Sequence, residues 1–291
     1  MLKKSLISCL VFLALAGSHP SSCAADRKDV DILVKRTLRD MVPIPGGTFE
    51  MGDFGSKIGE KRPLTGETDD QPLHKVTLSD FSFSKYKVTY RDYDIFTAAT
   101  GKKKIDPGDT LLMSKHFRDP DMAAALDWYQ SREYCQWLGK QANKKMDIPT
   151  EAQWEYVARN KGEYVVYATD NGEFIDGHNI PTSDQKRKYT NFGDLNIPIA
   201  KLPPTPLGIF DMAGNGTDWV MDWYSPEYYK NSPEKDPQGP ADGNEKVIRG
   251  YQAGGGAFSN QTVFRQHALP DVNKGQDFLD PTMNARCVIN E

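Results

Sequence analysis

Two cysteines far apart in the chain, Cys135 and Cys287, carry the most definite chemistry in this sequence. If the protein reaches an oxidising compartment, two such thiols are typical of a disulfide. The bond would close a long loop and stabilise the fold, in the chain-entropy view by restricting the unfolded chain. The alternative is a pair of free, reactive thiols. The residues alone leave both open, and the disulfide is the simpler interpretation.

The histidines show no metal-binding pattern. His74 has no second histidine at a ligand-like spacing, which favours a hydrogen-bonded structural role. His267 lies close to Arg265, and a histidine in such a place could act as an acid or a base. One histidine beside one arginine is more typical of a polar network, which is the role we predict.

The first 25 residues are typical of an export signal. Two lysines precede an apolar run at residues 6–16 that is too short to cross a membrane, and small residues lead to Ala25. We predict a signal peptide at 1–25, an N-terminal extension at 26–40 and a periplasmic or secreted protein. Lipidation through Cys23 stays open, because cleavage after Ala25 would remove that cysteine.

Composition excludes several classes of function. The formal net charge is only −4 and the positive charges are scattered, so the basic surface of a nucleic-acid binder is missing. The apolar run near the N-terminus is too short for a span, so we expect no transmembrane protein. No stretch has the composition of a linker, which favours one domain over residues 41–291.

The elements that must position these residues are short. The pair Gly46-Gly47 between apolar residues predicts a hairpin over residues 41–51. Capping and spacing predict three helices, the third with Thr150 and Gln153 as a capping box. The helices are expected at 90–100, from about 127 and from 150, and further strands at 76–78, 81–83 and 247–249. Little regular pattern lies between 159 and 247, and so long a loop region needs a stabilising or functional reason.

Several segments, in matching order along the chain, resemble the formylglycine-generating enzyme family, the sulfatase-modifying-factor type. They are MVPIPGGTFEMG (41–52), QPLHKVTL (71–78), YKVT (86–89), DWYQSREYCQWL (127–138), IPTEAQWEYVAR (148–159), LGIFDMAGN (207–215) and ARC (285–287). The resemblance implies an α+β, C-type-lectin-related single domain with low regular secondary structure. It also implies that Cys135 and Cys287 pair as a structural disulfide.

The chemistry of that family is not retained in these residues. Its members oxidise a sulfatase cysteine with oxygen and with copper held by two cysteines, soft ligands that suit Cu(I). The corresponding stretch here, RGYQAGGGAFSNQTVFR (249–265), has no cysteine, and Ala257 replaces the usual serine. We therefore expect no copper and no cysteine-dependent formylglycine formation.

The resemblance also implies a structural calcium site. The positions carried over are Asp211, Gly214, Gly216 and Asp218, and carboxylates with backbone carbonyls are the hard oxygen ligands that calcium accepts. Asn191 resembles part of a second calcium site. The alternative is that the two aspartates only cap turns.

We favour a non-catalytic binding protein. The family's groove holds an extended peptide, and we expect it to be kept here as a surface for another secreted or envelope protein, in an accessory or immunity-type role. Aromatic residues are typical anchors of such surfaces. The predicted groove residues are Trp223, Tyr228, Tyr251, Ser259, Arg265 and His267.

Two other functions stay open. One is a cysteine-independent periplasmic oxidoreductase acting on a small molecule, similar to the family relative that matures pyoverdine. The other is a purely structural envelope protein. Fold alone does not decide among them.

Overall fold

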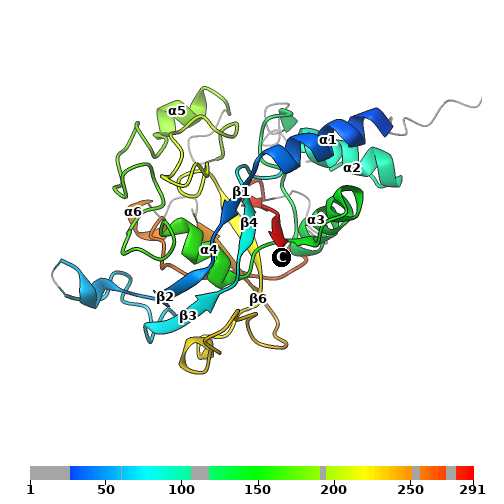
Figure 1. Cartoon of the computed structure of the whole chain (residues 1–291). Helices are drawn as coiled ribbons and strands as arrows, with labels where there is room; N and C mark the ends of the chain where they lie inside the picture. The colour runs from blue at the N-terminus through cyan, green and yellow to red at the C-terminus, as the bar shows by residue number, and fades with distance from the viewer. Residues whose placement is uncertain (1–26, 60, 106–117, 191–194, 251–255, 273–279) are drawn as a thin grey trace, which may run out of the picture.

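Short elements joined by long loops make up the computed structural model, which describes residues 27–59, 61–105, 118–190, 195–250, 256–272 and 280–291 (Figure 1). The helices are α1 (Arg27–Arg39), α2 (Tyr90–Thr100), α3 (Trp128–Ala142), α4 (Glu151–Ala158), α5 (Ser183–Arg187) and α6 (Gly256–Ser259), with 3-10 turns at Gly55–Lys57 and Tyr228–Lys230. The strands are β1 (Met41–Ile44), β2 (Gly47–Met51), β3 (His74–Leu78), β4 (Phe81–Ser84), β5 (Met146–Asp147), β6 (Thr217–Trp223), β7 (Lys246–Gly250), β8 (Gln266–Ala268), β9 (Met283–Asn284) and β10 (Val288–Asn290).

The described strands form three sheets. The first has the order β1-β4-β10-β5, the second pairs β2 with β3, and the third has the order β8-β7-β6-β9. All neighbouring strands are antiparallel except β6 and β9, which run parallel. Helices and strands thus share one α+β fold, as the sequence predicts.

The predicted hairpin over residues 41–51 is wrong. β1 pairs with β4 and β2 pairs with β3, so the chain continues through Gly46 and does not turn back there. One register runs through both pairs, from Met41 opposite Ser84 to Met51 opposite His74. At the interruption Gly46 N donates to Asp80 Oδ1 at 2.7 Å, and a Cβ on Gly46 would lie 2.2 Å from the carbonyl oxygen of Leu78. Gly46 therefore allows close approach of the two strands.

The three helices predicted by capping are confirmed. Thr89 caps α2, and Gly101 ends it in the left-handed conformation. Asp127 and Gln130 form a capping box at α3, and Thr150 and Gln153 form one at α4. Each box satisfies backbone N–H groups that a helix start leaves without partners.

Strand β6 was not predicted, because its sequence lacks the alternation that marks a half-buried strand. Residues 217–220 are all buried, Asp218 among them, and Asp222 follows. A strand covered on both faces shows no period of two. The strand nevertheless lies at the centre of the fold (Figure 1).

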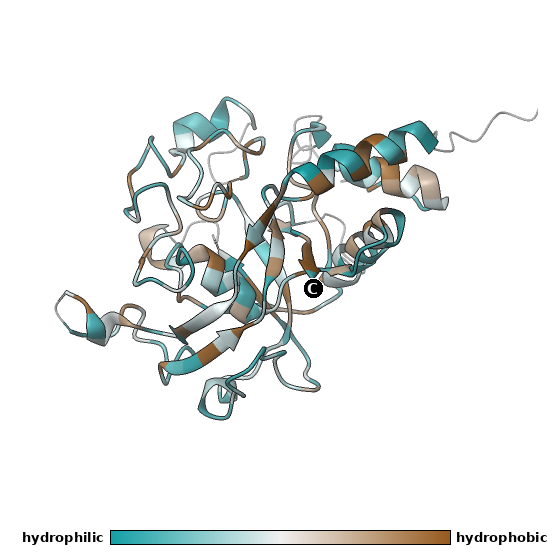
Figure 2. Cartoon of the chain, in the orientation of Figure 1, coloured by the Kyte–Doolittle hydropathy of each residue, from teal (hydrophilic) through white to brown (hydrophobic). Residues whose placement is uncertain are grey.

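A disulfide joins Cys135 in α3 to Cys287, immediately before β10, and confirms the predicted pairing. Strand β10 is inserted between β4 and β5, so the bond ties the end of the chain to the helical side of the core. Helix α1 packs on α2 and α3, and its buried residues are Val30 and Leu33. Leu33 belongs to the apolar core, whereas most of α1 is hydrophilic (Figure 2). Among the described residues no helix is long and apolar enough to span a membrane.

Candidate functional site

A cavity of about 590 Å³ opens beside the third sheet. Its wall is built from the loop at residues 67–69, from residues 224 and 226, from β7 and β8, and from residues 280–283. Arg265 and His267, both in the predicted groove, line it. The segments come from distant parts of the sequence, so only the fold brings them together.

Arg265 is a fixed part of the wall. Its Nε and Nη2 donate to the two carboxylate oxygens of Glu151 at 2.7 and 3.0 Å, and Nη1 donates to the carbonyl oxygen of Asp69 at 2.6 Å. The guanidinium is buried, and a bidentate pair of this geometry is strong and directional. Its charge is therefore already balanced within the protein.

Helix α4 supplies the carboxylates behind this wall. Glu151 and Glu155 lie one helical turn apart, and Arg249 bridges them with bonds of 2.7 and 2.9 Å. Glu155 also accepts from Arg159 at 2.8 Å. Burial would raise the pKa of Glu151, but Arg265 and Arg249 outweigh it and hold that pKa below its usual value. Glu151 is thus an ionised partner of two buried arginines.

Tyr224 and His267 form the accessible polar part of the cavity. Their rings stack at 3.8 Å between centroids with an interplanar angle of 23°. Tyr224 Oη donates to Asp69 Oδ2 at 3.0 Å, and burial together with that carboxylate raises the pKa of Tyr224 to about 12. His267 Nδ1 lies 2.9 Å from Glu245 Oε2. The phenol stays protonated near neutral pH, so it is a hydrogen-bond donor.

The other described residues of the predicted groove, Trp223, Tyr228 and Ser259, do not line this cavity. Trp223 stacks on Trp128, and the two indoles enclose the Lys246 ammonium at 3.5 and 4.0 Å from their ring centroids. Tyr228 accepts a bond from Gly239 N at 3.1 Å. Ser259 is buried in α6. Tyr251 lies outside the described residues.

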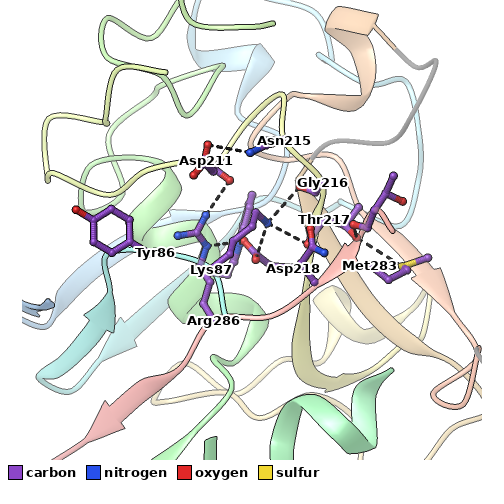
Figure 3. Close-up of polar contacts among 12 residues, drawn as sticks. Tyr86, Lys87, Asp211, Asn215, Gly216, Thr217, Asp218, Met283 and Arg286 are labelled. Atoms are coloured by element: carbon purple, nitrogen blue, oxygen red, sulfur yellow. Dashed lines mark hydrogen bonds and ion pairs between the residues drawn. The ribbon is translucent and has the colours of Figure 1, made fainter. Parts of the chain in front are cut away.

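In the loop that carries the predicted calcium residues, two cationic side chains bind the oxygen atoms (Figure 3). Lys87 Nζ donates to Asp218 Oδ1 at 2.7 Å, to Thr217 O at 3.0 Å and to Gly216 O at 3.3 Å. Arg286 Nε donates to Asp218 Oδ2 at 2.8 Å. Burial lowers the pKa of Lys87 to about 8, although the neighbouring Asp218 partly opposes this shift.

Asp211, the other carboxylate of the predicted calcium set, is bound separately. Its Oδ2 accepts from Ala200 N at 2.8 Å and its Oδ1 from Asn215 Nδ2 at 3.1 Å. Asn191 lies outside the described residues. Across the ranges that the structure covers, no three His, Cys, Asp or Glu side chains gather as a metal site. As the side chains stand, a calcium ion does not fit beside Lys87, and calcium binding in solution stays a prediction.

Sequence reasoning missed Lys87, Glu151, Glu155 and Tyr224. One signal could have found the glutamates: two acids four residues apart flank Trp154 in a segment predicted to be a core helix. Acids in a buried helix need cationic partners. Arg159 lies four residues beyond Glu155, but nothing local points to Arg249, which lies 98 and 94 residues from Glu151 and Glu155.

These features define an α+β domain, rich in loops and held at its end by a disulfide, whose cavity is walled by buried ion pairs. The chain belongs to the family of the sulfatase-modifying factor enzyme 1-like domain, whose profile matches residues 28–290. The family resemblance read from the sequence is thereby confirmed.

Named relatives show how far the similarity extends. The formylglycine-generating enzyme of Streptomyces coelicolor is 29% identical over 260 residues, covering 74% of this chain and 79% of the enzyme. The serine/threonine-protein kinase Pkn1 of Chlamydia trachomatis serovar L2 is 31% identical over 229 residues, which is 73% of this chain but 33% of the kinase. The solved structure of PvdO from Pseudomonas aeruginosa aligns with a TM-score of 0.66 at 24% identity, covering 86% of this chain and 94% of PvdO. That likeness shows a shared fold.

Proposed function

We propose that this chain is an exported protein that binds a segment of another secreted or envelope protein in the cavity beside β7 and β8. The observation that carries the proposal is the cavity itself, about 590 Å³ and open, with the Tyr224–His267 stack at its accessible side. Concave sites of this size, with aromatic walls and a few polar groups, are typical of binding sites.

Copper-thiolate oxidation is not part of this proposal. Residues 249–265 contain no cysteine, and Cys135 and Cys287 are joined to each other. Copper in this family's reaction needs two thiolates, and the two remaining cysteines, Cys9 and Cys23, both fall in the predicted signal peptide. The buried arginine–glutamate pairs behind the wall support a rigid surface.

The charges of the cavity favour a positively charged segment. Glu67, Asp69 and Asp280 contribute carboxylates to the lining, whereas the Arg265 charge is matched by Glu151. A lysine or arginine side chain of a partner would find these three carboxylates there. Binding of this kind weakens as salt concentration rises.

The test is affinity purification from the native cell envelope and secreted fraction with tagged protein, followed by mass spectrometry. Compared with wild type, His267→Ala should lose one stoichiometric partner and Glu67→Gln should retain less of it at moderate salt. Tyr189→Ala is the matched control, since this exposed tyrosine lies outside the cavity lining.

Equal retention of the partner by all variants would contradict the proposal. If wild type retains no protein at all, an enzyme acting on a small molecule becomes the leading hypothesis. In that case, metabolites that raise the melting temperature of wild type but not of His267→Ala would identify its substrate class.

A further inference from the structure

The ammonium group of Lys87 occupies a pocket of oxygen atoms deep in the protein. Its three acceptors are two backbone carbonyls, of Gly216 and Thr217, and one carboxylate oxygen of Asp218. The Lys87 side chain has 0% of its surface exposed. An ammonium has three N–H donors, so three acceptors match its bonding capacity.

These oxygens are of the type that a hard metal cation takes as ligands. The backbone is bent to present them: Asp211, Gly214 and Gly216 adopt φ of 57°, 73° and 81°. A Cβ on Gly216 would lie 2.3 Å from Asn284 Oδ1, so a residue with a side chain would not fit there. Carbonyl groups turned toward one buried point are costly unless a cation or donor faces them.

The charges around this point are already balanced. Arg286 donates to Asp218 Oδ2 and, through Nη2, to the carbonyl oxygens of Phe210 and Asp211 at 2.6 and 2.7 Å. Trp154 Nε1 donates to the same Asp218 oxygen at 3.1 Å. Lys87 and Arg286 thus oppose Asp218 and Asp211, all four buried (Figure 3). A divalent ion added to this set would leave excess positive charge in a buried site.

We propose that the Lys87 ammonium is an internal cation that replaces a metal ion at the loop of residues 211–218, so that this loop closes without calcium. Removing the ammonium while keeping Asp218 then leaves a vacant cation site of two carbonyls and a carboxylate. The inference concerns the fold and does not depend on the proposed function.

The test is a comparison of wild type with Lys87→Ala in calcium and in a chelator. Wild type should contain no stoichiometric calcium by elemental analysis, and its melting temperature should not differ between the two conditions. Lys87→Ala should melt lower in chelator and recover several degrees in millimolar calcium, since a ligand that binds the folded state stabilises it.

Terbium(III), a luminescent substitute for calcium, gives a direct readout. Trp154 contacts Asp218, so terbium bound there should emit when tryptophan is excited. We expect emission from Lys87→Ala and none from wild type. The matched control is Lys246→Ala, which removes another buried lysine whose Nζ donates to Met221 O and lies between two indoles, and should give no emission at this loop.

Two results would overturn the inference. One is wild type that carries calcium and loses it, with a lower melting temperature, when Asp218 is changed to Asn. The other is Lys87→Ala that folds but responds to neither calcium nor terbium. If Lys87→Ala folds in calcium alone, the inference is supported; if it folds in neither condition, the wild-type metal content and terbium emission decide.

Discussion

Charged side chains in the interior of this protein are connected in a network of ion pairs. Arg249 and Arg265 share Glu151, Arg249 and Arg159 share Glu155, and all are buried. Such sets add little net stability compared with an apolar core, but breaking one is costly because it leaves an uncompensated buried charge. They hold the cavity wall in one arrangement, which a binding surface requires.

Changing Glu151 to Gln should be strongly destabilising. The amide cannot balance Arg265, and we expect the free energy of unfolding to fall by about 3–5 kcal/mol. Urea denaturation followed by tryptophan fluorescence measures this loss. Glu163→Gln, at an exposed glutamate, is the control and should change stability by less than about 0.5 kcal/mol. Equal effects of the two variants would show that the ion pairs do not hold the wall.

Asp70 should make stability depend on pH. Its side chain is buried, its Oδ2 accepts from Thr65 at 2.5 Å, and burial raises its pKa to about 7. Because the folded pKa lies above the unfolded value of about 3.9, this contribution is full below pH 4 and is lost as pH rises through 7. In Asp70→Asn the decline between pH 5 and 8 should be smaller than in wild type. Denaturation midpoints across that range test it, and parallel profiles would refute the assignment.

At the scale of elements, capping residues and glycine stops predicted the helix boundaries, because these depend on contacts within a few residues. Thr150 with Gln153, and Gly101 at the end of α2, fix helix boundaries by contacts within a few residues. Pairing partners of strands are not local, so the glycine pair at 46–47 was misread as a turn. Strand β6 was not predicted, because a buried aspartate at Asp218 interrupts its apolar pattern. The partners that balance Asp218, Lys87 and Arg286, are distant in sequence.

The two glycines of that pair should respond differently to alanine. A Cβ on Gly46 would meet the backbone oxygen of Leu78 at 2.2 Å, whereas one on Gly47 would meet only the Tyr156 hydroxyl at 2.6 Å. The Leu78 backbone cannot move away without disturbing the pairing of β2 with β3, whereas the end of the Tyr156 side chain can move. Gly46→Ala should therefore cost about 2–3 kcal/mol and Gly47→Ala clearly less. Chemical denaturation of the two variants compares these losses directly. A larger loss for Gly47→Ala would contradict the strand pairing that continues in one register through Gly46.

At the scale of the whole molecule, the sequence indicated the family, the α+β class and two residues of the cavity, Arg265 and His267. The rest of the cavity could not be predicted, because its lining joins residues 67–69 to residues 224 and 226 and to residues 280, 282 and 283. The loops that make these contacts lack periodic patterns. Their positions are set by single long-range bonds, such as Tyr224 to Asp69.

The disulfide is the covalent member of these long-range links, and it should matter most for the first sheet. It joins residues separated by 152 positions and holds the segment that leads into β10, which lies between β4 and β5. A Cys135→Ser/Cys287→Ser variant should lose about 2–5 kcal/mol of stability, since the unfolded chain regains its freedom. If the bond also secures β10 in the folded state, amide hydrogen exchange should accelerate more in β4, β5 and β10 than in β6 and β7. Uniform acceleration across both sheets would instead mean that the bond acts on the unfolded chain alone, with β10 held in place by its own hydrogen bonds.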